Sequence, residues 1–249
     1  TTDGYDALHN DEVEVTATEK KLDFEHLADT FREPTEPSFL WTAHREQALA
    51  IHDREDRYQS FIYHLIKDVA DALNLDVRVE QTLAINGRIA DIYFFSVAGR
   101  LIGSLEVKRP VDPNKRKMTD DQLVVHPKAA GQLMRYMVEV LLMGGLRHSF
   151  ALFSTYQSTV LYWLGGSMDD NSALGSGVSE EHLRSVKFRK TETVDGNKTV
   201  VQQGTWGQLE LYRSRVVDLK EKLSVASLVG KALLLMIDAG CQPWAELNL

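Results

Sequence analysis

The sequence predicts an α/β fold, because helical and extended patterns alternate along its middle part. An apolar stripe with three- and four-residue spacing over residues 45–73 indicates an amphipathic helix. Three runs rich in β-branched and aromatic residues follow, over 77–85, 88–97 and 100–109. A second helix and two further strands come next, so the order is helix, three strands, helix, two strands.

The first helix has an acidic residue on its apolar stripe. The stripe consists of Glu55, Tyr58, Ile62, Ile66, Val69 and Leu73. Glu55 extends it at the N-terminal end, where the helix dipole favours a negative charge. This ordinary role of an acid at a helix start stays open beside a role in a functional site.

Two turns fix how the three strands pair. Asn86-Gly87 is the strongest short hairpin signal, and Ala98-Gly99 indicates a second tight turn. If Ala98-Gly99 is a two-residue turn, Asp91 lies directly opposite Glu106, and Lys108 lies diagonally beside Asp91 on the same side of the sheet. The pairing therefore predicts a cluster of two acids and one base.

The same pairing predicts an apolar face and a chemical face for these strands. The Asn86-Gly87 turn sets Glu80 opposite Tyr93, and Thr82 opposite Asp91. One face then carries Val79, Leu83, Ala90, Ile92, Phe94, Leu105 and Val107. The other carries Glu80, Asp91, Glu106 and Lys108.

Clear start and stop signals bound the second helix. Pro127 suits the first helical position, and Gly144-Gly145 is a normal stop. Residues 149–154 and 158–164 then predict two more strands.

The C-terminal third predicts a loop, a hairpin and a packing helix. Residues 165–185 are rich in Gly, Ser and Asp and indicate a long loop. Asp195-Gly196 predicts the turn of a hairpin, and the apolar run over 216–239 predicts a helix that closes the core.

Length and composition predict one main domain with two additions. The chain has 249 residues, of which 43% are hydrophobic and 26% charged, as in ordinary globular proteins. We expect an acidic arm over 1–37 with a short helix near 22–31, a core over 38–165, and a C-terminal part over 166–249 packed on that core. No uninterrupted apolar run reaches the roughly 18 residues of a membrane helix, so we expect no membrane partner. The single Cys241 suits a reducing, intracellular compartment, cytoplasmic or nuclear.

The net charge of −8 is unevenly distributed. Residues 1–37 hold eleven acidic and three basic residues, which accounts for the whole excess. Residues 100–150 hold nine basic residues against five acidic ones, including Lys115, Arg116, Lys117 and Arg135. Such a strip is suited to binding phosphates, although Lys115, Arg116 and Lys117 are equally compatible with a solvated loop.

Two opposed carboxylates favour a metal site. Side by side on a sheet they repel unless a cation lies between them. Asp91 and Glu106, with the backbone carbonyl of Val107, are hard oxygen ligands of the kind that Mg²⁺ or Mn²⁺ takes. Lys108 is placed to orient or deprotonate a water that attacks a phosphate. The alternative is a pair of solvated strand acids with Glu106 bridging to Lys108.

Asp91 followed by a hairpin and Glu106-Val107-Lys108 resembles the PD-(D/E)xK nuclease superfamily. The resemblance covers roughly residues 50–165 and implies a restriction-endonuclease-like α-β-β-β-α-β core with a mixed central sheet, here with extra C-terminal helices. It also implies that Glu55 is an auxiliary metal-binding acid. The chain departs from the motif at Ala90, where the family name has proline.

Gln132 and Tyr136 are similar to the Gln-x-x-x-Tyr motif of RecB-like branches, in which these residues support the site and contact DNA. A half-buried helix face remains the alternative for this pair. The resemblances together imply a magnesium-dependent deoxyribonuclease. The competing expectation is a catalytically silent module with this fold that binds nucleic acid or a protein.

The same arrangement also resembles the nuclease domains of Crinkler-type effector proteins, which act inside host cells. That resemblance implies an effector domain with a regulatory protein partner, and an acidic arm that lies over the basic strip.

Overall fold

The structure is a computed structural model that describes residues 14–20, 55–81, 84–85, 88–108, 118–155, 157–165, 177–179, 181–182, 190–194, 197–202, 208–219 and 221–241. Within these ranges, backbone alone is described for 55–57, 84–85, 88–89, 190–194, 197–202 and 222–223. The helix expected near 22–31 and most of the loop expected over 165–185 lie outside the described residues.

A mixed eight-stranded sheet forms the centre of the fold, which confirms the α/β class. Its strand order is β1-β11-β8-β7-β6-β5-β2, with β12 also paired to β8. The pairs β6–β7 and β1–β11 are parallel, and the other pairs are antiparallel. The strands are β1 (Thr18–Glu19), β2 (Val77–Gln81), β5 (Ile92–Ser96), β6 (Leu101–Lys108), β7 (Phe150–Thr155), β8 (Ser158–Gly165), β11 (Glu210–Arg213) and β12 (Val217–Asp218).

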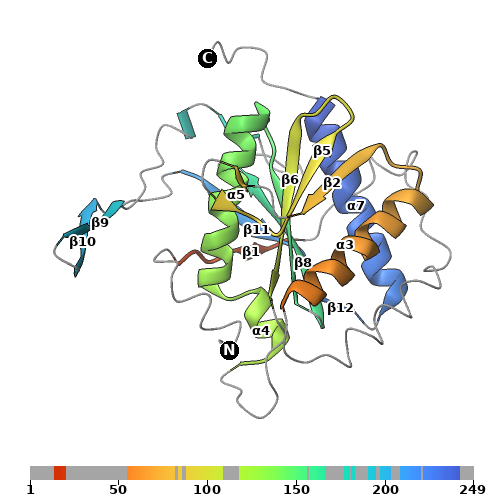
Figure 1. Cartoon of the computed structure of the whole chain (residues 1–249), viewed down its shortest axis with the longest axis horizontal. Coiled ribbons are helices and arrows are strands. Elements are labelled where there is room, and N and C mark those ends of the chain that lie inside the picture. Colours follow the sequence, from red (N-terminus) through yellow and green to blue (C-terminus); the bar gives the residue numbers. More distant parts are fainter. Residues whose placement is uncertain are drawn as a thin grey trace.

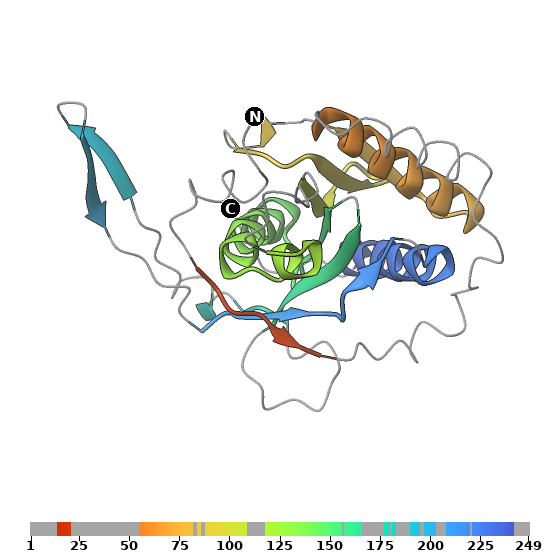
Figure 2. The same ribbon diagram turned by 90° about the horizontal axis from the view of Figure 1, so that it is seen from below.

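Helices cover both faces of the sheet (Figures 1 and 2). One face packs against α3 (Glu55–Ala72) and α7 (Lys222–Cys241), and the other against α4 (Asp120–Val124) and α5 (Pro127–Gly144). Apart from α4 and two strands of two residues each, the order is α3-β2-β5-β6-α5-β7, which is the expected α-β-β-β-α-β order.

The expected bounds of α5 are confirmed at both ends. Pro127 occupies the first helical position, and the side chain of His126 before it accepts a hydrogen bond from the Lys128 amide at 3.3 Å. Gly145 ends the helix with φ of 59°, a left-handed conformation that costs glycine little.

The register of the first hairpin is also confirmed. Glu80 lies opposite Tyr93 in the pair of β2 and β5. Beyond β2 the ribbon continues as two short strands, β3 (Ala84–Ile85) and β4 (Arg88–Ile89), which pair in the same register around the expected turn at residues 86–87.

The second turn differs from expectation, yet the register that it was expected to set is correct. The turn contains three residues, Val97 to Gly99, because the Gly99 amide bonds to the Ser96 carbonyl and Ser96 pairs with Arg100, both at 2.8 Å. Gly99 adopts φ of 81°, as such three-residue turns require. With this turn alone, the pairing of β5 with β6 would be shifted by one residue from the expected register.

A β-bulge at Ile102 removes that shift. Phe95 lies opposite Leu101, but Phe94 lies opposite Gly103, so Ile102 is the extra residue. Beyond the bulge Ile92 pairs with Leu105, which is the expected register, and Asp91 lies just before the start of β5. Ile102 and Gly103 both approach α7, and a Cβ on Gly103 would clash with the sulfur of Met236.

The expectation of one apolar face and one chemical face needs correction. Both faces of β6 are buried, since all eight of its residues are. Leu105 and Val107 pack towards α3 and α7, while Tyr93, Phe95 and Ala90 pack with α5. Ala90 therefore belongs to the opposite face from the one expected, because the strand is interrupted at residues 90–91 and its alternation breaks there.

The C-terminal part also differs in one element. Val217 and Asp218 form β12 against β8 instead of starting the last helix, and α7 begins at Lys222. The hairpin expected around residues 195–196 is present as β9 (Lys190–Val194) and β10 (Asn197–Gln202).

Helix α7 contains an 18-residue window, Ser224–Cys241, that is long and apolar enough to cross a membrane, with 56% of it buried in the fold. A core helix passes the same test.

Part of the acidic arm belongs to the sheet. The arm pairs with β11 in parallel through Thr18 and Glu19, and the amide of Val15 donates to the Pro127 carbonyl at 3.0 Å. The Glu19 carboxylate accepts a hydrogen bond from Arg213 at 2.5 Å.

Candidate active site

Both carboxylate oxygens of Asp91 are held by nitrogen donors. The side-chain amide of Gln59 on α3 donates to Oδ1, and the backbone amide of Val107 on β6 donates to Oδ2, each at 2.6 Å. The amide of Ala90 donates to the Tyr93 hydroxyl at 3.3 Å instead of to a strand. The interruption of the ribbon thus frees Asp91 to reach the edge of β6.

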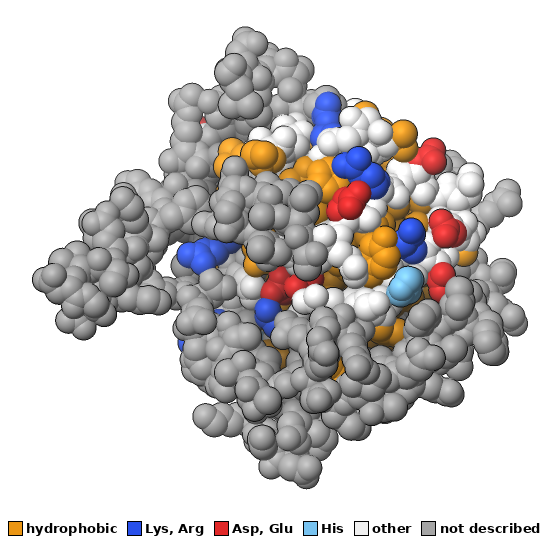
Figure 3. Space-filling view, in the orientation of Figure 1, with side chains coloured by type: hydrophobic (Ala, Val, Ile, Leu, Met, Phe, Trp, Pro, Cys, Tyr) orange, Lys and Arg blue, Asp and Glu red, His pale blue; other side chains and the backbone are white. Residues whose placement is uncertain are grey.

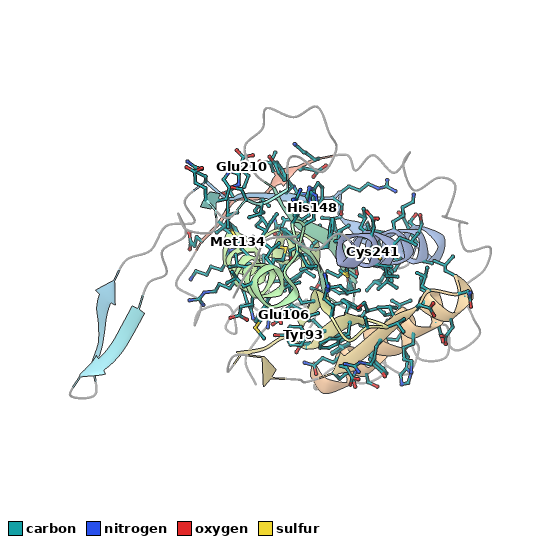
Figure 4. The ribbon with its side chains drawn as sticks, turned by 90° about the horizontal axis from the view of Figure 1, so that it is seen from above. Tyr93, Glu106, Met134, His148, Glu210 and Cys241 are labelled. Atoms are coloured by element: carbon teal, nitrogen blue, oxygen red, sulfur yellow. The ribbon has the colours of Figure 1, made fainter. Side chains whose placement is uncertain are left out.

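Glu106 and Lys108 form a buried ion pair on the α5 side of β6. Alternation along the strand places them on one face, and they are only 3% and 6% exposed. Figure 4 labels Glu106 in the layer between α5 and α3, near Tyr93. Since β6 is a central strand, neither side chain can reach bulk water easily.

Gln132 and Tyr136 extend this ion pair into a network. The Gln132 amide donates to Oε1 of Glu106 at 2.8 Å and to the Tyr136 hydroxyl at 3.2 Å. The two residues lie one turn apart on α5, so their side chains can meet. Gln132 therefore contacts Glu106 directly, and Tyr136 is linked to Glu106 through Gln132.

Strand geometry directs the Val107 carbonyl, which was expected to be a metal ligand, towards the Asp91 side of β6. In an extended strand the amide and the carbonyl of one residue point towards the same neighbouring strand. The Val107 amide points to Asp91, so its carbonyl leaves the strand towards the same side.

Gln59 is the residue of this network that the sequence reasoning missed. It lies one turn after Glu55, at the edge of the buried stripe of α3. That position could have indicated that Gln59 reaches the same site as Glu55, because residues i and i+4 share a helix face. Glu55 starts α3, but its side chain lies outside the described residues, so its expected role as a metal ligand stays a prediction.

The expected nucleic-acid contacts are only partly within the described residues. Arg135 lies half-buried on α5 near Gln132, whereas Lys115, Arg116 and Lys117 fall in a segment that is not described. On the face drawn in Figure 3, the acidic and basic side chains of the described residues are interspersed.

The donor set fits a hard divalent cation. The part of the chain that is described contains no group of three or more His, Cys, Asp or Glu side chains suited to a metal. Mg²⁺ usually binds through one or two carboxylates and keeps several waters. Asp91, Glu106 and the Val107 carbonyl therefore meet its ordinary needs without a third acid.

One titratable group is perturbed at the opposite end of the sheet. Burial lowers the pKa of the His148 imidazole below its usual value; Asp238 opposes this shift and Arg147 adds to it. His148 precedes β7, whose Phe150 pairs with Gly103 near the start of β6, whereas Glu106 and Lys108 lie at its end.

Comparisons with known proteins identify no relative. No protein-family model, no curated protein and no solved structure matches this chain.

Proposed function

We propose that this protein is a magnesium-dependent nuclease of the PD-(D/E)xK type that hydrolyses phosphodiester bonds in DNA. One observation carries the proposal: the Asp91 carboxylate binds the amide that joins Glu106 to Val107, directly beside the buried Glu106–Lys108 pair. Asp91 thus contacts the backbone of β6 between the two residues that form the buried pair.

The cost of this arrangement supports a functional role. Removing a carboxylate and an ammonium from water costs several kcal/mol per ion, and apolar residues of similar size are often as stable or more stable. Glu106 and Lys108 are almost fully buried in a central strand. A fold that needed only stability would be better served by apolar side chains there.

Each residue has a part in the proposed reaction. A divalent ion bound at Asp91 and Glu106 supplies charge neutralisation and a more acidic water. The Lys108 ammonium balances the negative charge that develops on the phosphate and orients the attacking water. Gln132 fixes the orientation of Glu106, and Tyr136 in turn holds Gln132.

A plasmid cleavage assay tests this function. We expect cleavage with Mg²⁺ or Mn²⁺, none with a chelator, and at least about a 100-fold loss in Asp91→Asn and Lys108→Met. Ser60→Ala, an exposed substitution on α3, is the control and keeps full activity. Cleavage that persists in folded Asp91→Asn would show that the roles are wrongly assigned.

A second candidate is a silent module with this fold that binds nucleic acid or a protein. It is favoured by one observation: Asp91 and Glu106 each accept hydrogen bonds from protein donors, namely Gln59 and the Val107 amide for Asp91, and Lys108 and Gln132 for Glu106. Calorimetric titration with Mn²⁺ separates the two, since the silent module binds no ion at this site.

A further inference from the structure

Gln59 is the side chain from α3 that reaches the acidic site in the described structure. Its Nε2 atom lies 2.6 Å from Oδ1 of Asp91. Helix α3 is held against the sheet by buried residues on both sides of Gln59, including Tyr58 and Ile62. The packing of α3 therefore fixes the position of the Gln59 carboxamide beside Asp91.

We propose that Gln59 is a ligand of the divalent ion, through its side-chain carbonyl oxygen, and so completes the set formed by Asp91, Glu106 and the Val107 carbonyl. The inference rests on the proposed function. The sequence led us to expect that α3 supplies a metal ligand through Glu55. We now assign that contribution of α3 to the neutral side chain of Gln59.

The spacing of the two side chains supports this assignment. Neighbouring ligands of an octahedral Mg²⁺ at about 2.1 Å lie about 3 Å from each other. The terminal atom of Gln59 and Oδ1 of Asp91 already lie at nearly this separation. The two groups, which come from α3 and from the residue just before β5, are therefore close enough for one ion to contact both.

The carboxamide of Gln59 can interact favourably with the site both with and without a bound cation. Its oxygen and nitrogen are almost equal in size, so a half-turn of the group exchanges them. Without a cation the nitrogen faces the carboxylate, because an oxygen there would be repelled. With a cation between the groups the oxygen is favoured, since amide carbonyls are good ligands for hard cations.

The lack of charge on Gln59 also affects the affinity of the site for a metal ion. A glutamine adds a ligand without adding a third negative charge beside Asp91 and Glu106. A glutamate at the same place would bind the ion more tightly, but the free site would then contain more repulsion. Gln59→Glu and Gln59→Ala should therefore change metal affinity in opposite directions.

Mn²⁺ binding to the whole chain, measured by calorimetry and by the paramagnetic resonance of free Mn²⁺, tests the inference without any cleavage assay. Gln59→Ala should raise the Kd for Mn²⁺ about tenfold, as loss of a supporting group at a metal site does. Gln59→Glu should lower the Kd by a similar factor. Gln81→Ala is the matched control, because Gln81 is exposed and its amide donates only to the main-chain carbonyl of Gln59, at 3.5 Å.

The outcomes separate this inference from the proposed function. If Asp91→Asn abolishes Mn²⁺ binding while both Gln59 variants stay within twofold of the wild type, the ligand role of Gln59 is refuted and the nuclease proposal stands. If the wild type binds no Mn²⁺, or Asp91→Asn binds it unchanged, the proposed function fails as well. Gln59→Glu keeps the size of the side chain, so it supplies the test even if Gln59→Ala does not fold.

Discussion

Helices α5 and α7 cover opposite faces of the same central strands, but they bury different chemistry. Towards α7, β6 presents Leu105 and Val107 to an apolar layer that contains Leu233 and Met236. Towards α5, the same strand buries Glu106 beside Lys108, and the helix adds polar side chains to the contact.

The comparison indicates which face carries function. Burying apolar groups stabilises a fold by about 25 cal/mol per Å², whereas burying an ion pair gains little or costs stability. Both faces also bury small hydroxyl side chains, such as Ser154 and Ser104. The buried ion pair, however, lies on the α5 face at the end of β6, beside the backbone amide that binds Asp91.

The largest effect should come from breaking the ion pair on the α5 face. Lys108→Met removes the ammonium from beside a buried carboxylate, and the free energy of unfolding should fall by about 3–5 kcal/mol. Glu106→Gln should also destabilise, while the double variant Glu106→Gln/Lys108→Met should recover most of the loss. Urea unfolding of the wild type and the three variants measures these free energies.

Activity should not follow stability in these variants. All three variants should lose cleavage, because the double variant restores packing and not the chemistry. Equal stability of the single and double variants would contradict the view that the buried charges are kept for function.

A smaller but purely structural effect is expected on the α7 face. Leu233 is fully buried, so Leu233→Ala should lower the free energy of unfolding by about 3 kcal/mol through the cavity that it leaves. The Kd for Mn²⁺ and the activity of the folded protein should not change. Leu234→Ala on the same helix is the matched control, because Leu234 is only partly buried and should cost less. A changed Kd in Leu233→Ala would show that the faces are coupled.

The smallest effect concerns pH and lies at the other end of the sheet. The folded pKa of His148 is lowered by burial, so below about pH 6.5 the unfolded chain takes up a proton that the folded chain does not. Stability from this group is therefore complete above that pH and declines as the pH falls towards the folded pKa. Melting temperatures at pH 7.5 and 5.5 should differ less in His148→Gln than in the wild type. An equal or larger difference would assign the acid sensitivity to other groups.

The sequence by itself determined the parts that depend on local chemistry. Pro127 and Gly145 bound α5, and the turn expected from Asn86-Gly87 predicted the observed pairing of β2 with β5. The pairing of Glu106 with Lys108 on one face of β6 followed from strand alternation. In each case a few neighbouring residues carry the information, because turn dihedrals and strand period are local properties.

Only the tertiary structure decided the rest. The turn at residues 97–99 has one more residue than expected, and the bulge at Ile102 corrects the register, because the strand must match its buried partners as well as its turn. Val217 and Asp218 became a strand because β8 offered them a partner. The contact of Gln59 with Asp91 and the burial of Glu106 under α5 depend on which helix packs over which strand. No local pattern encodes that choice, because the competing packings differ in contacts between residues that are distant in the chain.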